Sequence, residues 1–343
     1  MARILVTGGA GFIGSHLAER LVERGDHVTV LDDFSTGRRE NLASLEGHPR
    51  LELIEGTVLD AELVDRLVGQ VDAVFHMAAA VGVDWVLKHP LRSLETNIQG
   101  TEHVLRACDA VDGGRRVLIA STSEVYGKNE KDALSEDDDR VLGSSRLSRW
   151  FYASAKAIDE AFALAYFYDR QLPVTVVRLF NTVGPRQTGR YGMVVPRFVR
   201  WALRNEPVRV YGDGEQTRCF TNVHDVVRAL IALMDTPRAA GEIFNIGQPN
   251  EIRIADLARR VIELTESNSE LKLVPYDAEE AYGDRAAGYE DMRRRVPDAS
   301  KLFEYTGFQP RIGLDDTLRQ VIDYEMRVAA GETNRATETA RPA

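Results

Sequence analysis

The stretch that decides the fold is residues 4–14, ILVTGGAGFIG. It begins with a short apolar run that is typical of a buried strand. It then breaks into a loop with glycines at Gly8, Gly11 and Gly14, each three residues after the last. Glycines at this spacing allow a tight turn, a close approach of a ligand to the backbone, and close packing of a following helix on the strand.

The residues after this loop predict a helix and a second strand. Ile13, Leu17 and Leu21 recur at helical spacing, so the helix begins inside the glycine loop. Residues 27–31 (HVTVL) predict the strand, which ends at Asp32. Strand, glycine loop, helix, strand and acid is the order of a dinucleotide-binding unit, in which the pyrophosphate lies at the helix N-terminus.

Asp32 bears on which dinucleotide binds. It lies 18 residues after Gly14, close to the spacing at which an acid accepts hydrogen bonds from the adenosine ribose. A carboxylate there repels a 2′-phosphate, so the sequence favours NAD over NADP as the cofactor. Arg38 and Arg39 follow within one loop and leave NADP as the lesser alternative.

Strands and helices continue to alternate, which predicts an α/β fold with a Rossmann-type, doubly wound parallel sheet. Ligands of such sheets bind beyond the carboxyl ends of the strands. The predicted strands are 51–54, 73–76, 116–120 and 174–177, and the predicted helices are 61–68, 91–108 and 151–170.

After residue 185 the regular alternation of strands and helices ends. This change predicts a smaller C-terminal α/β lobe that closes over a substrate. The signs are a turn at 212–214, helices at 223–234 and 254–264, and an irregular Tyr- and Arg-rich stretch at 276–297. The boundary is not sharp, because late strands can return to the main sheet. The expected units are a dinucleotide-binding domain at 1–185, a substrate lobe at 186–328 and a disordered tail at 331–343.

Composition narrows the classes of function. A net charge of -10 without a basic block argues against binding to nucleic acid or a membrane surface. An anionic ligand would then need local arginines and backbone N–H groups. Cys108 and Cys219 have no paired spacing, so we expect no disulfide and no metal site. The N-terminus shows no signal peptide and no apolar run is long enough to span a membrane, so we expect a cytoplasmic protein.

Tyr152 and Lys156 are the first candidates for chemistry. They lie four residues apart in the predicted helix, and therefore on one face. A nearby ammonium favours the phenolate and lowers the tyrosine pKa. Such a tyrosine can take the proton from an alcohol while a hydride leaves the same carbon. On spacing alone, the two residues could merely share a helix surface.

A set of further motifs resembles the extended short-chain dehydrogenase/reductase family, and within it the NAD-dependent sugar-nucleotide epimerases, dehydratases and decarboxylases. The resemblance covers nearly the whole chain to about residue 325. The motifs are TGGAGFIGSH (7–16), LDDFSTG (31–37), HMAA (76–79), NIQGT (97–101), STSEVYG (121–127), YASAK (152–156), RLFNTVGPR (178–186) and VYGDG (210–214).

The resemblance implies that NAD stays bound and is recycled. Tyr152 would be the base, Lys156 would hold the nicotinamide ribose, and Thr122 would contact the sugar 4-hydroxyl. Asn181 and Arg218 would bind the substrate, Arg218 at its diphosphate. Thr57 follows the third strand where many relatives have an acid for adenine. The implied cofactor-binding residues are Gly8, Gly11, Phe12, Ile13, Gly14, Asp32, Asp33, Ala78, Asn97 and Lys156.

Residues 123 and 124 indicate which reaction follows oxidation at carbon 4. The 4,6-dehydratases carry an Asp-Glu pair there, whereas this chain has Ser123 and Glu124. The stretch TSEVYG (122–127) is similar to UDP-glucuronate decarboxylases, and GYEDMRRRVP (288–297) places Arg295 on their catalytic arginine. We therefore expect loss of carbon dioxide from UDP-glucuronate and re-reduction to UDP-xylose or its 4-keto form.

Other interpretations stay open. The chain could be a UDP-glucose or UDP-glucuronate 4-epimerase, a 4,6-dehydratase, or a non-catalytic NAD-binding relative. Arg149 and Arg186 either hold the sugar carboxylate or form structural ion pairs. The helices at 91–108 and 151–170 could form a homodimer bundle, as in relatives, although their apolar stripes equally fit a core.

Overall fold

A computed structural model of the protein describes residues 1–82, 89–189, 193–275 and 292–331. Most of the irregular stretch expected at 276–297, and all but the first residue of the expected tail at 331–343, lie outside the described residues.

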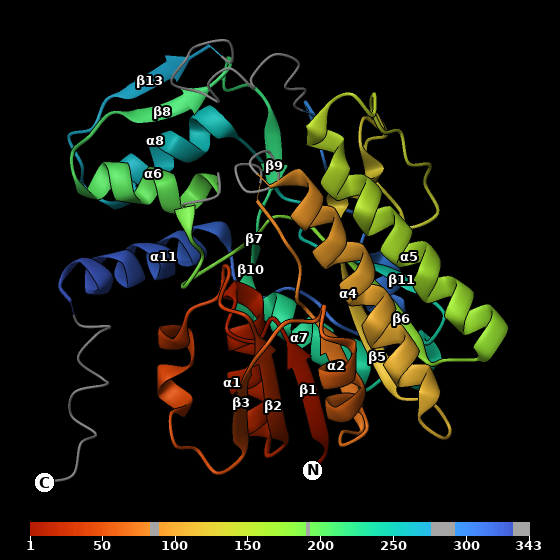
Figure 1. Ribbon diagram of the computed structural model, residues 1–343. Coiled ribbons are helices and arrows are strands. Elements are labelled where there is room, and N and C mark those ends of the chain that lie inside the picture. Colours follow the sequence, from red (N-terminus) through yellow and green to blue (C-terminus); the bar gives the residue numbers. More distant parts are fainter. Residues whose placement is uncertain (83–88, 190–192, 276–291, 332–343) are drawn as a thin grey trace, which may run out of the picture.

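A seven-stranded parallel sheet forms the centre of the molecule (Figure 1). The chain runs outward from β1 to β2 and β3, then returns to the other side of β1 for β4, β5 and β6. This reversal creates a crevice beyond the carboxyl ends of β1 and β4. The order is β11 (Ile243–Ile246), β6 (Val174–Leu179), β5 (Arg116–Thr122), β4 (Ala73–His76), β1 (Arg3–Thr7), β2 (His27–Asp32) and β3 (Leu51–Glu55). The predicted doubly wound α/β sheet is confirmed.

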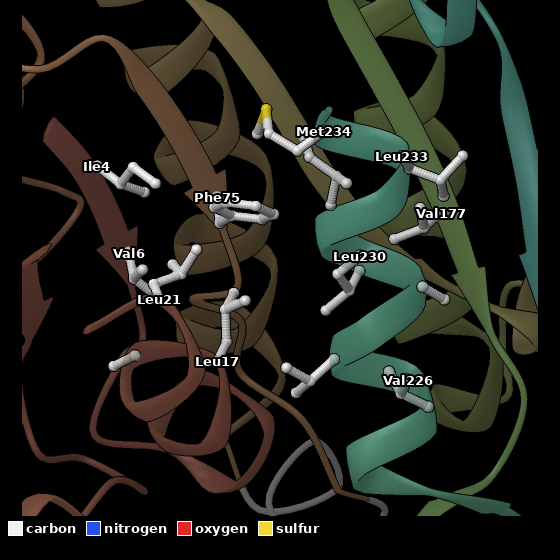
Figure 2. Close-up of a cluster of buried hydrophobic side chains, with 14 of the residues drawn as sticks. Ile4, Val6, Leu17, Leu21, Phe75, Val177, Val226, Leu230, Leu233 and Met234 are labelled. Carbon is white, nitrogen blue, oxygen red and sulfur yellow. The ribbon is translucent and has the colours of Figure 1, made fainter. Parts of the chain in front are cut away.

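One face of the sheet is covered by α1 (Phe12–Arg24) and α7 (Val223–Met234), with α10 (Ser300–Thr306) beside β11. Leu17 and Leu21 of α1 meet Leu230 of α7 over β1 and β4, as Figure 2 shows. Each leucine of this kind, fully buried, contributes about 1.5–3 kcal/mol to stability. The helix predicted from the spacing of Leu17 and Leu21 is therefore present, and its apolar stripe faces the sheet.

The other face is covered by α2 (Ala61–Val68), α4 (Pro90–Ala110) and α5 (Phe151–Arg170). Figure 1 shows α4 and α5 packed side by side along β5 and β6. Their apolar residues, such as Val104 and Ala163, are fully buried against the sheet. Helices on both faces complete the layered architecture expected from the alternating pattern.

The second half of the chain builds a smaller layer with its own core of Phe198, Val210, Leu257 and Leu318. Its helices are α6 (Val194–Leu203), α8 (Ile254–Leu264) and α11 (Leu314–Ala329). Its strand pairs are β8 (Val208–Tyr211) with β13 (Leu271–Val274), β9 (Thr217–Cys219) with β12 (Glu251–Arg253), and β7 (Thr182–Val183) with β10 (Thr221–Asn222).

Not all of the second half belongs to this layer. α7 covers the main sheet and β11 pairs with β6, so late elements do return to the first unit. Short 3-10 helices lie at η1 (Arg39–Leu45), η2 (Ser123–Tyr126), η3 (Ser148–Trp150) and η5 (Pro237–Ala239). Of the helices that the structure describes, none combines the length and apolar character that a membrane crossing requires.

Candidate active site

The glycine loop joins β1 to α1 and forms one wall of a pocket at the carboxyl end of the sheet. Gly8 has a φ of +68°, and a Cβ there would lie 2.7 Å from the Ala78 nitrogen. A Cβ on Gly14 would collide with the carbonyl oxygen of Gly8. The N-cap of α1, Gly11, supplies no side-chain hydrogen bond, so the first N–H groups of the helix are left for an anion. Phe12 and Ile13 line the same wall.

Asp32 lies at the far end of the loop and is buried. Its carboxylate accepts hydrogen bonds from the backbone nitrogens of Ala10 and Phe34, each at 2.9 Å. Burial raises its pKa. Asp32 and Asp33 both line the pocket, as predicted for an acid that meets the ribose.

Arg39 does not offer a free charge for a 2′-phosphate. Its guanidinium pairs with Glu55 and lies 4.4 Å from the ring centre of Phe34. The wall next to it is formed by Gly56, Thr57 and Val58. The position after the third strand is thus occupied by a hydroxyl rather than an acid, and the donor set fits NAD better than NADP.

Ala78 lines the pocket, whereas Asn97 lies behind it. The Asn97 side chain accepts from the Ala80 nitrogen at 2.9 Å and donates to the Ala80 oxygen at 3.3 Å. The Asn97 amide therefore fixes the 78–80 backbone that lines the pocket, and its predicted part in binding the cofactor stays a prediction.

Tyr152 and Thr122 come together at the deep end of the pocket. Thr122 ends β5, and Tyr152 lies in the first turn of α5, which directly follows η3. Their hydroxyls hydrogen-bond, a contact that opposes the rise in the pKa of Tyr152 caused by burial. Thr122 also accepts from the Glu124 nitrogen at 3.2 Å, which caps η2 and orders the loop that carries Ser123 and Glu124.

Lys156 pairs with Asp159 on its own helix. Its ammonium donates to Asp159 at 2.6 Å, with both side chains at most 1% exposed. The pKa of Tyr152 is raised, first by burial and then by the negative charges of Glu124 and Asp159. Lys156 is not among the groups that act on this pKa in the chain by itself, and its effect on Tyr152 with NAD bound stays a prediction.

Glu124 and Arg295 form a second charged pair beside this tyrosine. Arg295 Nη1 donates to Glu124 Oε1 at 2.5 Å, and the side chains are only 6% and 18% exposed. Arg295 Nε has no hydrogen-bond partner among the described residues. The Glu124 carboxylate is thus near enough to Tyr152 to raise its pKa, and it holds the Arg295 guanidinium.

The segment around Val296 pairs with Leu134 and thereby holds Arg295 next to Glu124. Leu134 donates to the Val296 oxygen at 2.8 Å, and Asp298 donates to the Leu134 oxygen at 2.9 Å. Asn245 of β11 bonds both Leu134 and Asp298 through its side-chain nitrogen, at 2.8 Å and 3.0 Å. No local pattern could predict this contact, since Glu124 and Arg295 are 171 positions apart.

Four further predicted residues lie at different places. Asn181 has a φ of +31° and donates to the Cys219 oxygen at 2.9 Å. Arg218 is buried and donates to the Met292 oxygen at 2.8 Å. Arg186 makes two hydrogen bonds to Glu19 of α1, at 2.9 Å and 2.6 Å, which favours its structural alternative. Arg149 lies in η3, and its side chain is outside the described part of the chain.

The sequence prediction missed part of the pocket wall. Arg92 and Thr96 lie four apart on α4 and line the pocket, so their helical spacing was a usable signal. Ser121 and Leu179 line it from the ends of β5 and β6, where any side chain of a parallel sheet is a candidate. The described residues contain no cluster of three His, Cys, Asp or Glu that could hold a metal ion.

A family model described as GDP-mannose 4,6-dehydratase matches residues 5–321. The chain belongs to this family. The family fits the site described above, with its glycine cradle, its buried acid and its Tyr–Thr pair at the deep end. The resemblance to NAD-dependent sugar-nucleotide enzymes is thereby confirmed.

Individual relatives refine the comparison. A protein of Bacillus cytotoxicus named UDP-N-acetyl-alpha-D-glucosaminuronate decarboxylase is 44% identical over 94% of this chain and 97% of its own. UDP-glucuronic acid decarboxylase 1 of Arabidopsis thaliana is 37% identical over 95% of this chain and 70% of its own length. A similar solved structure is that of UDP-glucuronic acid 4-epimerase from Bacillus cereus in complex with UDP-glucuronic acid and NAD. It is 29% identical with a TM-score of 0.83, and the match covers 95% of this chain and 99% of that one.

Proposed function

We propose that this chain is an NAD-dependent decarboxylase of a UDP-hexuronate, with UDP-glucuronate as substrate. The observation that carries the proposal is the buried Glu124–Arg295 pair beside Tyr152 and Thr122. Simple oxidation and re-reduction at carbon 4 need only the tyrosine and the hydroxyl. A carboxylate and a guanidinium at the same place supply what a second reaction at carbon 5 requires.

The first step is oxidation at carbon 4 of the sugar. Tyr152, as phenolate, takes the proton of the 4-hydroxyl, and Thr122 holds the same oxygen by a hydrogen bond. NAD, when bound, would supply the hydride acceptor for carbon 4 and, in its reduced form, the donor for the final re-reduction. The glycine cradle at Gly8, the N-terminus of α1 and Asp32 would hold it.

The second step is loss of the carboxylate. With a ketone at carbon 4, the carboxylate on carbon 5 is β to a carbonyl, so the bond between them breaks and carbon dioxide leaves. The electron pair moves into an enolate whose oxygen Tyr152 and Thr122 stabilise as donors. Glu124 and Arg295 then deliver one proton to carbon 5, directly or through water. The balance is UDP-hexuronate plus one proton giving a UDP-pentose and carbon dioxide.

Position 123 supports this reaction over dehydration. A dehydration across carbons 5 and 6 uses two carboxylic groups, one as acid and one as base. Ser123 is buried and carries no carboxylate. Epimerisation, the other alternative, does not call for a charged pair next to carbon 5.

The 2-acetamido analogue is a second candidate substrate. The relative named for UDP-N-acetylglucosaminuronate shares 44% of its residues with this chain, against 37% for the Arabidopsis enzyme. The chemistry at carbons 4 and 5 is the same for both sugars. Only the group on carbon 2 differs, so the choice rests on the sugar pocket and not on the catalytic residues.

Two companion proposals concern NAD and assembly. NAD rather than NADP follows from Asp32 and from the engagement of Arg39 by Glu55. The proposal of a homodimer through α4 and α5 is supported by the exposed apolar residues Ile158 and Tyr168 on α5, which are 42% and 66% exposed. Light scattering at several protein concentrations would measure the assembly.

The test supplies UDP-glucuronate and UDP-N-acetylglucosaminuronate in parallel and follows the mass of the nucleotide sugar together with released carbon dioxide. The proposal predicts a UDP-pentose, or its 2-acetamido form, with stoichiometric carbon dioxide. A product of unchanged mass would indicate 4-epimerisation. NAD binding without turnover of either sugar would favour a binding protein.

A further inference from the structure

Asp159 is a buried acid to which the proposed reaction assigns no task. It lies three residues after Lys156 on α5, and therefore on the same face of the helix. Its Oδ2 accepts the Lys156 ammonium at 2.6 Å, and its side chain is 0% exposed. Its Oδ1 has no hydrogen-bond partner among the described residues. Burying a carboxylate costs free energy that only good partners offset.

A chain of hydrogen bonds leads from the pocket wall towards this acid. The Ala78 nitrogen donates to Thr7 Oγ1 at 3.3 Å, so the Thr7 hydroxyl is left to donate to His76 Nδ1 at 2.8 Å. His76 Nε2 then donates to Thr101 Oγ1 at 3.2 Å. The Thr101 hydroxyl faces Asp159. Burial raises the pKa of that carboxyl, and the Lys156 ammonium and the Thr101 hydroxyl oppose the rise.

The direction of this chain depends on a neutral histidine. Burial, and then the charge of Lys156, lower the pKa of His76 to about 3. A neutral imidazole has one donor and one acceptor nitrogen, which is what the Thr7 and Thr101 contacts use. β1, β4, α4 and α5 are thus connected by one ordered row of groups that ends at Asp159.

The charges around Asp159 and Tyr152 come from several elements. Lys156 and Glu160 face Asp159 from its own helix, and Thr101 faces it from α4. Tyr152 is acted on by Asp159 and by Glu124 of η2, whose own partner is Arg295. Removing the Asp159 charge would leave the Lys156 ammonium without its counterion.

We propose that Asp159 is a positioning residue for the function proposed above: it holds Lys156 in place and offsets its charge, and so sets the pH range in which Tyr152 serves as base. The carboxylate touches neither Tyr152 nor the reacting carbons. It holds Lys156, the one positive charge among the described residues of α5 that is fully buried, and its own negative charge also acts on Tyr152.

The test is a titration of Tyr152 in the NAD-loaded protein without sugar. The near-ultraviolet phenolate band is followed against pH for wild type and Asp159→Asn, each corrected by its Tyr152→Phe counterpart. Loss of the negative charge makes the phenolate easier to form, so the Tyr152 transition moves to lower pH by about one unit, the size typical of a nearby charge. An unshifted transition would overturn the proposal.

Control variants separate this role from a structural one. Asp159→Glu keeps the charge and should keep the wild-type transition. Glu160→Gln removes the neighbouring buried carboxylate, which pairs with Arg178, and should lower the melting temperature without moving the transition. If Asp159→Asn does not fold, Asp159→Leu removes the same charge with an apolar side chain of similar size, and the same shift is expected.

The pH profile of kcat/KM gives an independent readout. Its acid limb should move to lower pH in Asp159→Asn by the same amount as the titration, whereas a merely structural defect lowers the whole profile. The titration needs no sugar. If wild-type protein decarboxylates neither UDP-hexuronate, the proposed function fails while the role of Asp159 is still decided by the titration.

Discussion

Beside the Tyr152 hydroxyl, the Glu124 carboxylate and the Arg295 guanidinium are held in one ion pair that is almost closed to solvent. Water competes weakly with such a pair, so each group keeps its partner until a substrate displaces it. The unpaired Nε of Arg295 adds a donor at the same place. At the scale of single residues, we propose that these two side chains determine that decarboxylation, rather than epimerisation, follows oxidation at carbon 4.

Glu124→Gln tests the acid. The amide keeps the shape but cannot take up or deliver a proton, so kcat should fall by about 100-fold or more. NAD affinity should stay within about two-fold of wild type, since Glu124 does not line the cofactor pocket. Single-turnover absorbance of NADH together with calorimetric NAD binding would measure both. Wild-type turnover in this variant would mean that Glu124 is only a loop carboxylate.

The neighbouring arginines offer a matched pair of variants. Arg295→Lys should abolish most decarboxylation, because an ammonium cannot present the planar set of donors. Arg294→Lys is the control, since Arg294 is 41% exposed and pairs with Glu251 at the surface. Its kcat/KM should stay close to wild type. Equal losses in the two variants would contradict a specific role for Arg295.

His76 predicts how stability depends on pH. In the folded protein the pKa of His76 is about 3, below its ordinary value of 6.5. The stability that the neutral ring contributes to the folded state is therefore complete above pH 6.5 and is lost as pH falls towards 3. Between pH 6.5 and 5 the loss should be about 2 kcal/mol. Because the pKa values of His16 and His224 are lowered as well, the His76 share is measured by urea unfolding of wild type and a His76 variant at both pH values. The variant His76→Gln should lose about 2 kcal/mol less over this interval, and an identical loss would contradict the account.

At the scale of elements, the β1–α1 unit holds the cofactor pocket together. The glycine loop lets the start of α1 approach β1 so closely that no side chain fits at Gly14. The pyrophosphate site is therefore a property of the whole strand–loop–helix unit rather than of one residue.

Gly14→Ala should disrupt this unit. The added methyl collides with the Gly8 carbonyl, so the loop must shift and NAD affinity should fall by about 100-fold or more. Gly313→Ala is the control, because a Cβ there meets no atom within 4 Å. Fluorescence titration with NADH would compare the two. Unchanged affinity in Gly14→Ala would show that the loop does not bind the dinucleotide as proposed.

The elements themselves were largely predictable from sequence. The helices at Ala61–Val68, Val223–Met234 and Ile254–Leu264 have the predicted bounds, because apolar spacing and turn residues determine them locally. Side-chain partners were not predictable in this way. Lys156 was expected to act on Tyr152 but pairs with Asp159, and Arg186 pairs with Glu19 of α1. Such choices depend on packing between distant segments, which a local pattern does not contain.

At the scale of the whole molecule, the two halves of the chain share one core. Leu230 of α7 and Phe244 of β11 are fully buried in the same cluster as Leu17 and Val6. The reaction site is shared as well, since Arg295 reaches Glu124 from the end of the chain. This long-range contact is the part of the site that only the resemblance, and no spacing rule, could suggest.

A fragment of residues 1–185 should therefore not fold on its own. Without α7 and β11, the face of the sheet that α1 and α7 share loses part of its cover, and Leu17, Leu21 and Phe75 become exposed to water. Circular dichroism should show no cooperative thermal transition for the fragment, whereas a chain ending at residue 331 should unfold like the full chain. A sharp transition of the fragment would instead support an independent first domain.

The most direct test of the proposed reaction is product analysis by nuclear magnetic resonance after turnover of UDP-glucuronate in deuterium oxide. Decarboxylation with proton delivery by the Glu124–Arg295 pair predicts a UDP-pentose with one solvent deuterium at carbon 5 and no carboxylate carbon. A UDP-hexuronate that retains its carboxylate, inverted at carbon 4 and free of deuterium at carbon 5, would contradict it.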